Sequence, residues 1–419
     1  MCGDERKRNL RLVEAMSNEM IDARQKLAMA FFVMCWLLSP IAGALVLYVF
    51  CFLVIRNQRA CVFSCIIVGL TLGLLSYCSQ QGSMMACDII RYRDQWETYI
   101  DRPYGEMFGP NILFDSINWF LANYLLSDSR WVGFFWVTIS TSVYLSACTL
   151  MIFSVVRKKK DDIIFIAGIT CLIIIPFTII NELLKQTVAV SFILMAISLS
   201  YLRRPGAVIC IIVALLTHVT STVLFFPIVF WRNKFVRKYI KVFTLVSIGL
   251  GMINIVMVMN TILAHIPIVR VMGLALALEN YASFDSWGGS KRFYLGFAFF
   301  IFQLVYVFAH TYRMQRFINL RIILLLIFCT IMINFSNVHN FARLINTLYP
   351  FNALALIVGI LESKSSSARL LLALVTGTSL FVSSLIQIHS NISHNYFVTY
   401  MNNDILQLLS SNIIDFLEV

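Results

Sequence analysis

Residues 163–202 read IIFIAGITCLIIIPFTIINELLKQTVAVSFILMAISLSYL, and this stretch decides the fold. A helix rises about 1.5 Å per residue, so a run of this length crosses a hydrocarbon layer of about 30 Å twice. The only two charges, Glu182 and Lys185, lie at its centre. Because ionisable groups are costly in lipid, the sequence predicts two transmembrane helices with NELLKQ at a membrane boundary or lining a cavity.

The whole chain has the composition of a protein whose surface faces lipid. Of its 419 residues, 59% are hydrophobic and 13% are charged, and the mean hydropathy is +0.81. Runs of roughly twenty apolar residues between short basic clusters are typical of transmembrane helices, whereas barrel strands are shorter and alternate. We therefore expect an all-α polytopic integral membrane protein with about 10–12 transmembrane helices and short interfacial helices on the outward face.

The expected spans follow the apolar runs. They cover 27–55, 60–78, 131–155, 163–180, 184–202, 242–263, 293–312, 320–338, 347–361 and 370–388. Segment 207–231 has basic clusters at both ends, which favours a hairpin of two short helices meeting at THVTS. Segment 27–55 is interrupted at Ser39-Pro40 and is bent or hairpinned, which leaves the side of the N-terminus open.

The charges of the loops predict which helix ends face the cytoplasm. Basic clusters lie at 56–59, 157–160, 203–204, 232–241, 313–321 and 364–369. By the positive-inside rule these loops are cytoplasmic, and the remaining loops face outward. The predicted organisation is a polar N-terminal segment 1–26, a transmembrane domain 27–390 with outward loops 79–130 and 264–292, and an outward tail 391–419.

Several function classes lose support from the same features. The net charge of +12 needs no nucleic-acid partner, because most of the excess is the insertion signal. Histidine and cysteine spacings predict no metal site, and no Walker loop, dinucleotide fingerprint or nucleophile elbow is present, so we expect no cofactor. Cys78 and Cys87 lie near the outer face and can pair there, although free thiols are the favoured reading.

The first outward loop contains an amphipathic pattern, CDIIRYRDQWETYI, whose aromatic residues recur at helical spacing. It predicts an interfacial helix over 88–101, and residues 111–126 continue as a second one. Arginine suits phosphate and aromatic rings suit sugars, so Arg91, Tyr92 and Arg93 are candidate ligands, with Asp94 as a candidate base. A plain interfacial belt with solvated charges is the alternative.

The NELLKQ turn joins the expected spans 163–180 and 184–202 at the outer boundary of the membrane. Glu182 and Lys185 are one helical turn apart and can pair with each other. Asn181 and Gln186 add polar groups on either side. We interpret the turn as a candidate site, with Glu182 as a base and Lys185 as a cation, and a solvated turn capped by Asn181 as the alternative.

Three further outward regions hold candidates. His218 lies at the tip of the proposed hairpin and can accept a proton or bind phosphate, although a lone histidine is often structural. Loop 264–292 contributes Arg270 and Tyr281 as candidate substrate ligands. Arg343, within NVHNFARLINTLYPF, is an isolated cation on the outward side, and a snorkelling anchor is its alternative reading.

The order of these features resembles the EpsG-like family of bacterial polysaccharide polymerases, which includes many Wzy-type O-antigen polymerases. The matching elements are CDIIRYRDQWETYI, NELLKQTVAVSFILMA, VALLTHVTSTVLF and ARLINTLYPFNAL, within roughly 60 to 390. The turn of the family usually reads Arg-Gln, whereas this chain has Lys185-Gln186, which keeps the charge without the bidentate fork. Val219-Thr220-Ser221 replaces the serine that commonly follows the histidine.

The resemblance implies a membrane glycosyltransferase in the bacterial cell inner membrane with its active site facing the periplasm. Such an enzyme transfers a growing glycan from undecaprenyl pyrophosphate onto the non-reducing end of a lipid-linked repeat unit. Its partners would be undecaprenyl-pyrophosphate-linked oligosaccharides, membrane lipid and, optionally, a chain-length regulator protein. Glu182, Asp94 and His218 are then the candidate bases. The cations that would offset the charge of the leaving pyrophosphate are Arg91, Arg93, Lys185 and Arg343.

Two other function classes stay open. A lipid-linked oligosaccharide flippase also has many spans and a basic cavity, but it should show two similar halves and charges near the membrane midplane. Another outward-face transferase, such as an O-antigen ligase or a sugar acyltransferase, is the third class. A ligase is expected to have one very large outward loop, and the outward loops of this sequence are modest.

Overall fold

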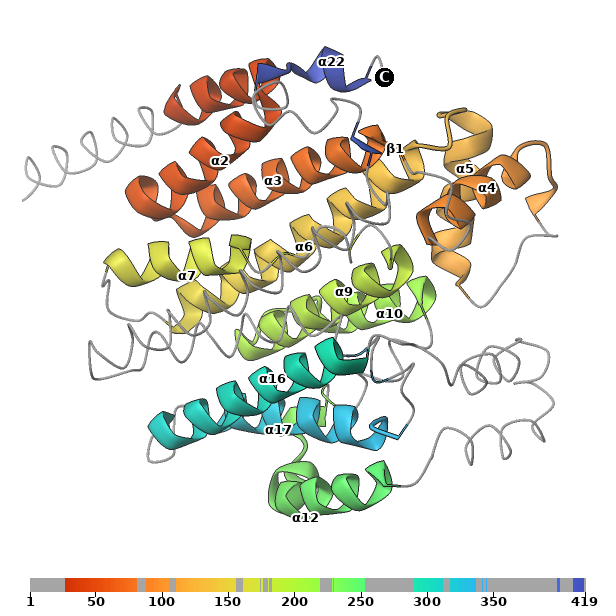
Figure 1. Ribbon diagram of the computed structural model, residues 1–419. Coiled ribbons are helices and arrows are strands. Elements are labelled where there is room, and N and C mark those ends of the chain that lie inside the picture. The colour runs from red at the N-terminus through yellow and green to blue at the C-terminus, as the bar shows by residue number, and fades with distance from the viewer. Residues whose placement is uncertain are drawn as a thin grey trace, which may run out of the picture.

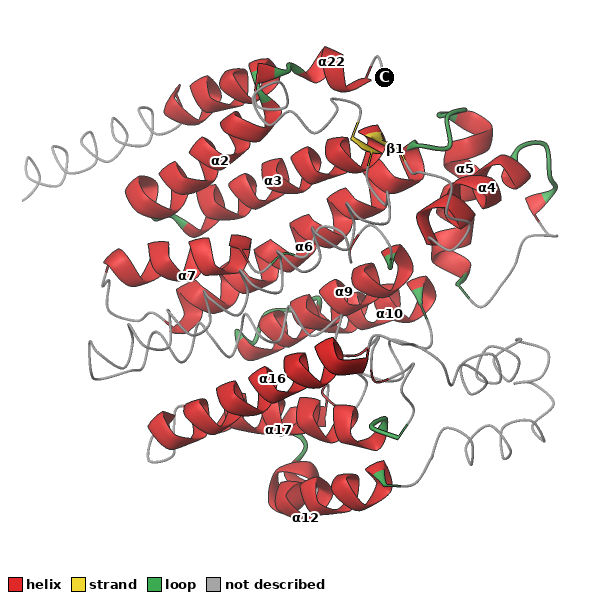
Figure 2. Ribbon diagram, in the orientation of Figure 1, coloured by secondary structure: helices red, strands yellow, loops and turns green. Residues whose placement is uncertain are grey.

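Figure 1 shows the computed structural model of the chain. The described residues are 27–80, 88–104, 111–155, 161–173, 175, 180, 183–218, 228, 230–252, 290–311, 317–336, 341, 344, 398–399 and 410–417. Within them the fold is built from helices, and the predicted all-α polytopic membrane protein is confirmed (Figure 2). A two-residue antiparallel pair, β1 (Ser79–Gln80) with β2 (Val398–Thr399), is a small addition to the helices.

Three described helices are long and apolar enough to cross a membrane, and they form the centre of the bundle. They are α3 (Gln58–Cys78), α6 (Trp131–Val155) and α9 (Leu184–Tyr201). Their bounds confirm the spans predicted for 60–78, 131–155 and 184–202. Helix α6 packs against α3 on one side and α9 on the other, as Figure 1 shows.

Glycines on α3 allow its backbone to approach α6 closely. A Cβ atom at Gly69 would lie 2.8 Å from the carbonyl oxygen of Thr138, and one at Gly73 would lie 2.7 Å from that of Phe134. Lipid tails are as apolar as leucine, so helices in a membrane associate largely through such close contact of small residues. The two glycines, one turn apart, therefore fix how α3 and α6 pack.

The segment 27–55 folds back on itself instead of crossing once. A helix over Leu27–Leu38 ends at Ser39, whose backbone is extended (φ −152°, ψ 92°), and α2 (Pro40–Phe50) begins at the proline. The rings of Phe32 and Phe50 have centroids 4.7 Å apart. In one straight helix these residues would be about 27 Å apart along the axis. Of the two expected forms, bent or hairpinned, the structure has the hairpin, and a five-residue π-helix (Cys51–Ile55) follows it.

The segment 207–231 also runs out and back, as its two basic ends predict. Helix α10 (Ala207–Thr217) has only 11 residues. The chain then returns to a 3-10 turn, Phe230–Arg232, at the far end of α9. There the rings of Tyr201 and Trp231 lie 6.2 Å apart, and the Arg232 guanidinium donates to the carbonyl of Ser200. Residues 219–227, where the second short helix was expected, are outside the described residues.

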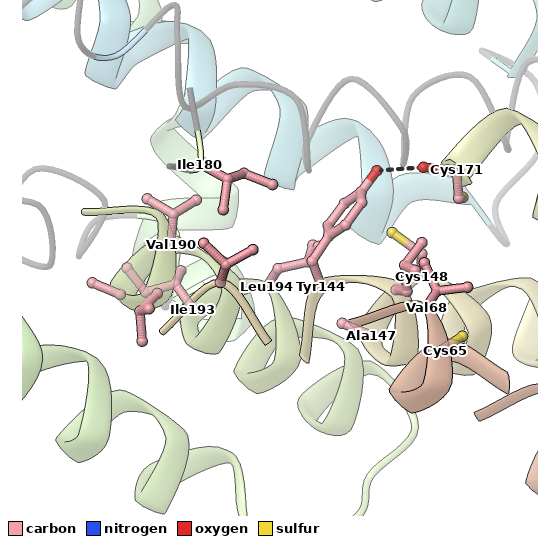
Figure 3. Packing of buried hydrophobic residues seen from close by; sticks show 14 of the residues in the cluster. Cys65, Val68, Tyr144, Ala147, Cys148, Cys171, Ile180, Val190, Ile193 and Leu194 are labelled. Atoms are coloured by element: carbon pink, nitrogen blue, oxygen red, sulfur yellow. Dashed lines mark hydrogen bonds between the residues drawn. The ribbon is translucent and has the colours of Figure 1, made fainter. Parts of the chain in front are cut away.

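A buried hydrophobic cluster joins these helices (Figure 3). Tyr144 of α6 points toward α7 (Asp161–Ile173), and its hydroxyl donates to the carbonyl oxygen of Cys171 at 3.3 Å. The Tyr48 hydroxyl bonds the carbonyl oxygen of Gly168 at 2.9 Å. Every described cysteine is a free thiol, and all but Cys35 are buried. They pack as small apolar side chains, as expected for cysteines within spans.

A second layer contains α12 (Lys234–Gly251), α16 (Ser290–Thr311) and α17 (Ile318–Ile333), with α12 packed against α17. Helix α12 begins eight residues before the span expected at 242–263, so the basic stretch 232–241 is largely helical instead of a loop. The reason is that long basic side chains can extend to the boundary from a helical backbone. Arg237 also bonds Asn319 Oδ1 at 2.8 Å, which ties α12 to the start of α17. The spans expected at 347–361 and 370–388 are outside the described residues.

Candidate functional site

Two short helices gather at one end of the bundle, where α3 ends and α6 and α9 begin (Figure 1). These are α4 (Asp88–Tyr99) and α5 (Ile112–Tyr124), which pack against each other. Helix α4 also contacts α6, and α5 contacts α10. The opposite ends of α3 and α9 carry the basic clusters at 56–59 and 203–204. Among the described residues, α4 and α5 thus lie at the bundle end opposite these two basic clusters, as the charge pattern predicts.

Helix α4 buries one side, as the helical spacing of its apolar and aromatic residues predicts. Ile89, Tyr92, Trp96 and Tyr99 are all buried, whereas Asp94 is exposed. Residues two apart on a helix point in roughly opposite directions, so Asp94 faces away from the packed side on which Tyr92 lies. Helix formation over the predicted stretch is confirmed. The helix ends at Tyr99, two residues early, because Asp101 has a positive φ of 63°.

Lys185 forms a buried ion pair that the sequence did not reveal. Its Nζ lies 3.3 Å from Oδ1 of Asp115 on α5, and the exposed fractions of the two side chains are 11% and 6%. The Tyr99 hydroxyl donates to the same oxygen at 3.0 Å. One carboxylate oxygen therefore joins residues from α4, α5 and α9.

Aromatic rings surround the ammonium group of Lys185. Its Nζ lies 4.5 Å from the ring centroid of Phe114 and 5.2 Å from that of Tyr92. Phe114 in turn stacks on Trp136 of α6, with centroids 4.6 Å apart. The Trp136 indole donates to Asn118 Oδ1 at 2.7 Å. A desolvated cation beside ring faces is stabilised by the negative face of each ring, so the cage and the carboxylate together make burial of this lysine tolerable.

The charge of Asp115 also acts on the hydroxyl of Tyr99. Burial raises the pKa of the Tyr99 hydroxyl above its ordinary value, and the charge of Asp115 raises that pKa further. The phenol therefore stays protonated and keeps donating its hydrogen bond. Lys185 and the neighbouring Gln186 are both buried, so both side chains lie in the packed interior.

A second charged group lies at the last turn of α3. The Arg130 guanidinium holds Oδ2 of Asp128 through Nε at 2.8 Å and Nη2 at 2.7 Å. The hydroxyl of Tyr77 donates to the same oxygen at 3.0 Å, and the guanidinium carbon of Arg130 lies 4.6 Å from the centroid of the Tyr77 ring. Arg93 of α4 donates from Nη2 to the carbonyl of Ser76 at 3.2 Å.

The pKa values in this second group show how its charges act on one another. Burial lowers the pKa of Arg93, and the charge of Arg130 lowers it further, more strongly than Asp128 raises it. Burial raises the pKa of Asp128, but hydrogen bonds from Arg130 and Tyr77, together with the charge of Arg130, outweigh that effect and leave the pKa below its ordinary value. The two arginines are thus close enough for their charges to repel each other.

The other sequence candidates fall into two sets. His218 ends α10 with an extended backbone (φ −154°, ψ 96°) and is half-buried, on the helix that contacts α5. Arg91 is exposed, with its guanidinium carbon 5.4 Å from the centroid of the Tyr92 ring. The candidates outside the described residues are Asn181, Glu182, Arg270, Tyr281 and Arg343.

Two residues at this end were missed by the sequence reasoning. Asp115 follows two apolar residues and a phenylalanine in NILFDS, and a charge inside such an amphipathic run was the available signal. Arg130 directly precedes the apolar helix α6, where a basic residue is usually read as an anchor. Among the described residues, no group of three or more histidine, cysteine or acidic side chains is placed to hold a metal ion.

The chain matches the model of a known protein family. The family model described as the EpsG family matches residues 62–402, which is most of the chain and includes α4, α5, α6, α9 and α10. No curated protein and no solved structure matches.

Proposed function

Because the chain belongs to the EpsG family, a family of Wzy-like polymerase-type membrane proteins, we propose that it is the O-antigen polymerase of a bacterial inner membrane. Its donor is a growing glycan on undecaprenyl pyrophosphate, and its acceptor is the non-reducing end of a lipid-linked repeat unit. The active site in this proposal faces the periplasm, at the bundle end formed by α4, α5 and the first turn of α9.

The observation that carries the proposal beyond the family is the contact between Lys185 and Asp115. It joins the NELLKQ segment to the amphipathic loop helices, although the two residues are 70 positions apart in the chain. The contact of α10 with α5 adds the helix that ends at His218. Three of the motifs that carry the family resemblance therefore meet at one end of the bundle, as one reaction centre requires.

The reaction requires a base and a stabilised leaving group. The acceptor hydroxyl attacks the anomeric carbon of the donor glycan, the carbon–oxygen bond to pyrophosphate breaks, and the hydroxyl proton passes to a base. We propose His218 or Glu182 for that base. Asp94 is a weaker candidate because it lies on the exposed face of α4. Arginines at the same end, Arg91 and Arg93 among them, and Arg343 would offset the charge on the pyrophosphate.

Lys185 has a different role in this proposal. Its ammonium is enclosed by Asp115 and two aromatic rings, so we assign it to positioning and not to direct contact with pyrophosphate. It holds α5 against α9 while other cations meet the substrate. Sequence alone left open whether this lysine contacts pyrophosphate or only holds Glu182. Glu182 is outside the described residues, and the ion pair with Asp115 supports a holding role with a different carboxylate.

The test is deletion of the gene followed by gel analysis of the lipopolysaccharide. Loss of the ladder with retention of a core carrying one repeat supports the polymerase. Absence of any repeat on the core would instead indicate a flippase or ligase, and an intact ladder would contradict all three functions. Complementation with His218→Ala should leave the single-repeat product at wild-type protein level, whereas an unchanged ladder would remove His218 from the mechanism.

A further inference from the structure

Two guanidinium groups converge on consecutive residues at the end of α3. Arg93, from α4, donates to the backbone carbonyl of Ser76. Arg130, from the turn before α6, lies over the ring of Tyr77. The two arginines are thus brought together by three segments of the chain that meet at the end of α3.

Asp128 holds Arg130 along one edge only. The carboxylate oxygen Oδ2 receives the hydrogens of Nε and Nη2, and Tyr77 donates to that same oxygen. The side chain of Arg130 keeps 28% of its surface exposed. A guanidinium has five N–H donors, so the edge opposite Asp128 retains donors for a further acceptor.

Two guanidinium groups held at neighbouring residues of α3 offer an anion both charge and N–H donors. Repulsion from Arg130 outweighs attraction from Asp128 at the position of Arg93. The partial charges at the end of α3 and at the beginning of α6 have opposite signs, so the side chains decide the local potential. A bound anion would relieve the repulsion between the two guanidinium groups.

Aromatic rings at this place indicate the level of the lipid head groups. The rings of Tyr77 and Trp131 lie 4.9 Å apart, and Trp131 packs edge-on against Phe134 at 5.0 Å. Tyrosine and tryptophan at the ends of membrane-spanning helices mark the interface between hydrocarbon and water. A phosphate joined to a polyprenyl chain lies at that same depth when its tail is in the hydrocarbon.

We propose that Arg93 and Arg130 form the site that binds the pyrophosphate group of a polyprenyl-linked glycan, with Asp128 and Tyr77 as the positioning residues that orient Arg130. This inference rests on the polymerase function proposed above and names the residues that hold its leaving group. A phospholipid head group offers related phosphate chemistry, and the experiment separates the two sources.

The experiment measures binding of undecaprenyl pyrophosphate to the purified full chain in nanodiscs of zwitterionic lipid. Arg130→Gln should weaken binding by about tenfold or more, since it removes a charged, fork-shaped donor. Arg130→Lys keeps the charge without the fork and should give an intermediate loss. Arg102→Gln is the matched control, because it removes an exposed arginine from the same outward loop and should leave binding unchanged.

Competition with phosphatidylglycerol identifies the source of the phosphate. Undecaprenyl pyrophosphate that resists an excess of this lipid supports the proposal, whereas equal competition would overturn it in favour of a general head-group site. Unchanged binding in Arg130→Gln and Arg93→Gln would also overturn it. Because binding is measured without polymerisation, these results are separate from the gene-deletion test. If the purified wild-type protein binds undecaprenyl pyrophosphate but deletion of its gene leaves the lipopolysaccharide ladder intact, the polymerase function is contradicted and the binding site is not.

If Arg130→Gln does not fold, Arg130→Lys decides the matter, since it retains the positive charge beside Asp128. Binding equal to wild type in a folded Arg130→Lys protein would overturn the bidentate role of Arg130. A loss that is reproduced by Arg93→Lys, with the melting temperature unchanged, supports a shared site.

Discussion

Lys185 at the start of α9 and Asp115 on α5 form an ion pair of 3.3 Å that is almost fully buried. The pair fixes a short amphipathic helix to a membrane-spanning one and gives the polar centre of NELLKQ a partner on another helix. Taking charges out of water is costly, and the cost is offset here by the carboxylate, the Tyr99 hydroxyl and two ring faces. Removing either residue alone therefore leaves the charge of the other buried without its partner.

The first prediction concerns that dependence. Lys185→Ala or Asp115→Ala should each destabilise the protein by about 3–5 kcal/mol, because each leaves an uncompensated buried charge. The melting temperature in detergent should fall in both variants, and polymer should be lost with it. The double variant Lys185→Met/Asp115→Leu removes both charges and should recover most of the melting temperature. A double variant no more stable than the single ones would contradict the pairing.

The second prediction concerns the close packing of α3 on α6. Gly73→Ala should destabilise by about 1–3 kcal/mol, because the new Cβ would lie 2.7 Å from a backbone carbonyl oxygen. Gly249→Ala on α12 is the matched control, since a Cβ there meets nothing within 4 Å. That control should be neutral or gain up to about 1 kcal/mol from helix propensity. Equal melting temperatures for the two variants would argue against the close approach.

Sequence reasoning predicted most of the central helices because lipid imposes a simple rule. A span needs about twenty apolar residues with internal hydrogen bonds, and α3, α6 and α9 satisfy that rule on their own. The fold-back at Ser39-Pro40 was only one of two forms that the sequence allowed. It depends on the packing of Phe32 against Phe50, a contact that a hydrophobic profile does not contain.

The candidate site was predicted less fully, for a physical reason. The face of α4 follows from its period, so the burial of Tyr92 was predictable. The partner of Lys185 was not, because sequence shows only neighbours within a turn, whereas Asp115 reaches it through the packing of α5 on the bundle. Arg130 was missed for the same reason, since it comes near Arg93 only through the packing of α4 and the start of α6 at the end of α3.

The third prediction concerns pH and the pair of Asp128 with Arg130. The folded pKa of Asp128 lies below its ordinary value of 3.8, so its stabilising effect is complete above that value and disappears as the pH falls through the folded pKa. Asp128→Asn should therefore lower stability by the same amount at pH 5.5 and pH 8, about 0.5–1 kcal/mol for a partly exposed pair. Melting temperatures of both proteins across this range provide the measurement. A difference that changes between pH 5.5 and 8 would show that another group controls it.

The fourth prediction concerns the C-terminal residues, which pack on the end of α3. The Cys78 thiol donates to the carbonyl oxygen of Phe416 at 2.9 Å, and the Phe416 ring is buried within α22 (Ile413–Leu417). Phe416→Ala should detach this short helix and expose Cys78, because Phe416 is the buried side chain of this five-residue element.

Maleimide labelling of the native protein, mapped by mass spectrometry, measures that exposure. Cys78 should be protected in the wild type and labelled several-fold faster in Phe416→Ala. Cys65 lies on the same helix, is fully buried, and should stay unlabelled in both proteins. Equal protection of Cys78 in the two proteins would contradict the packing of the tail on α3. Equal labelling of Cys65 and Cys78 would show that the ring stabilises the whole bundle instead of covering this one end.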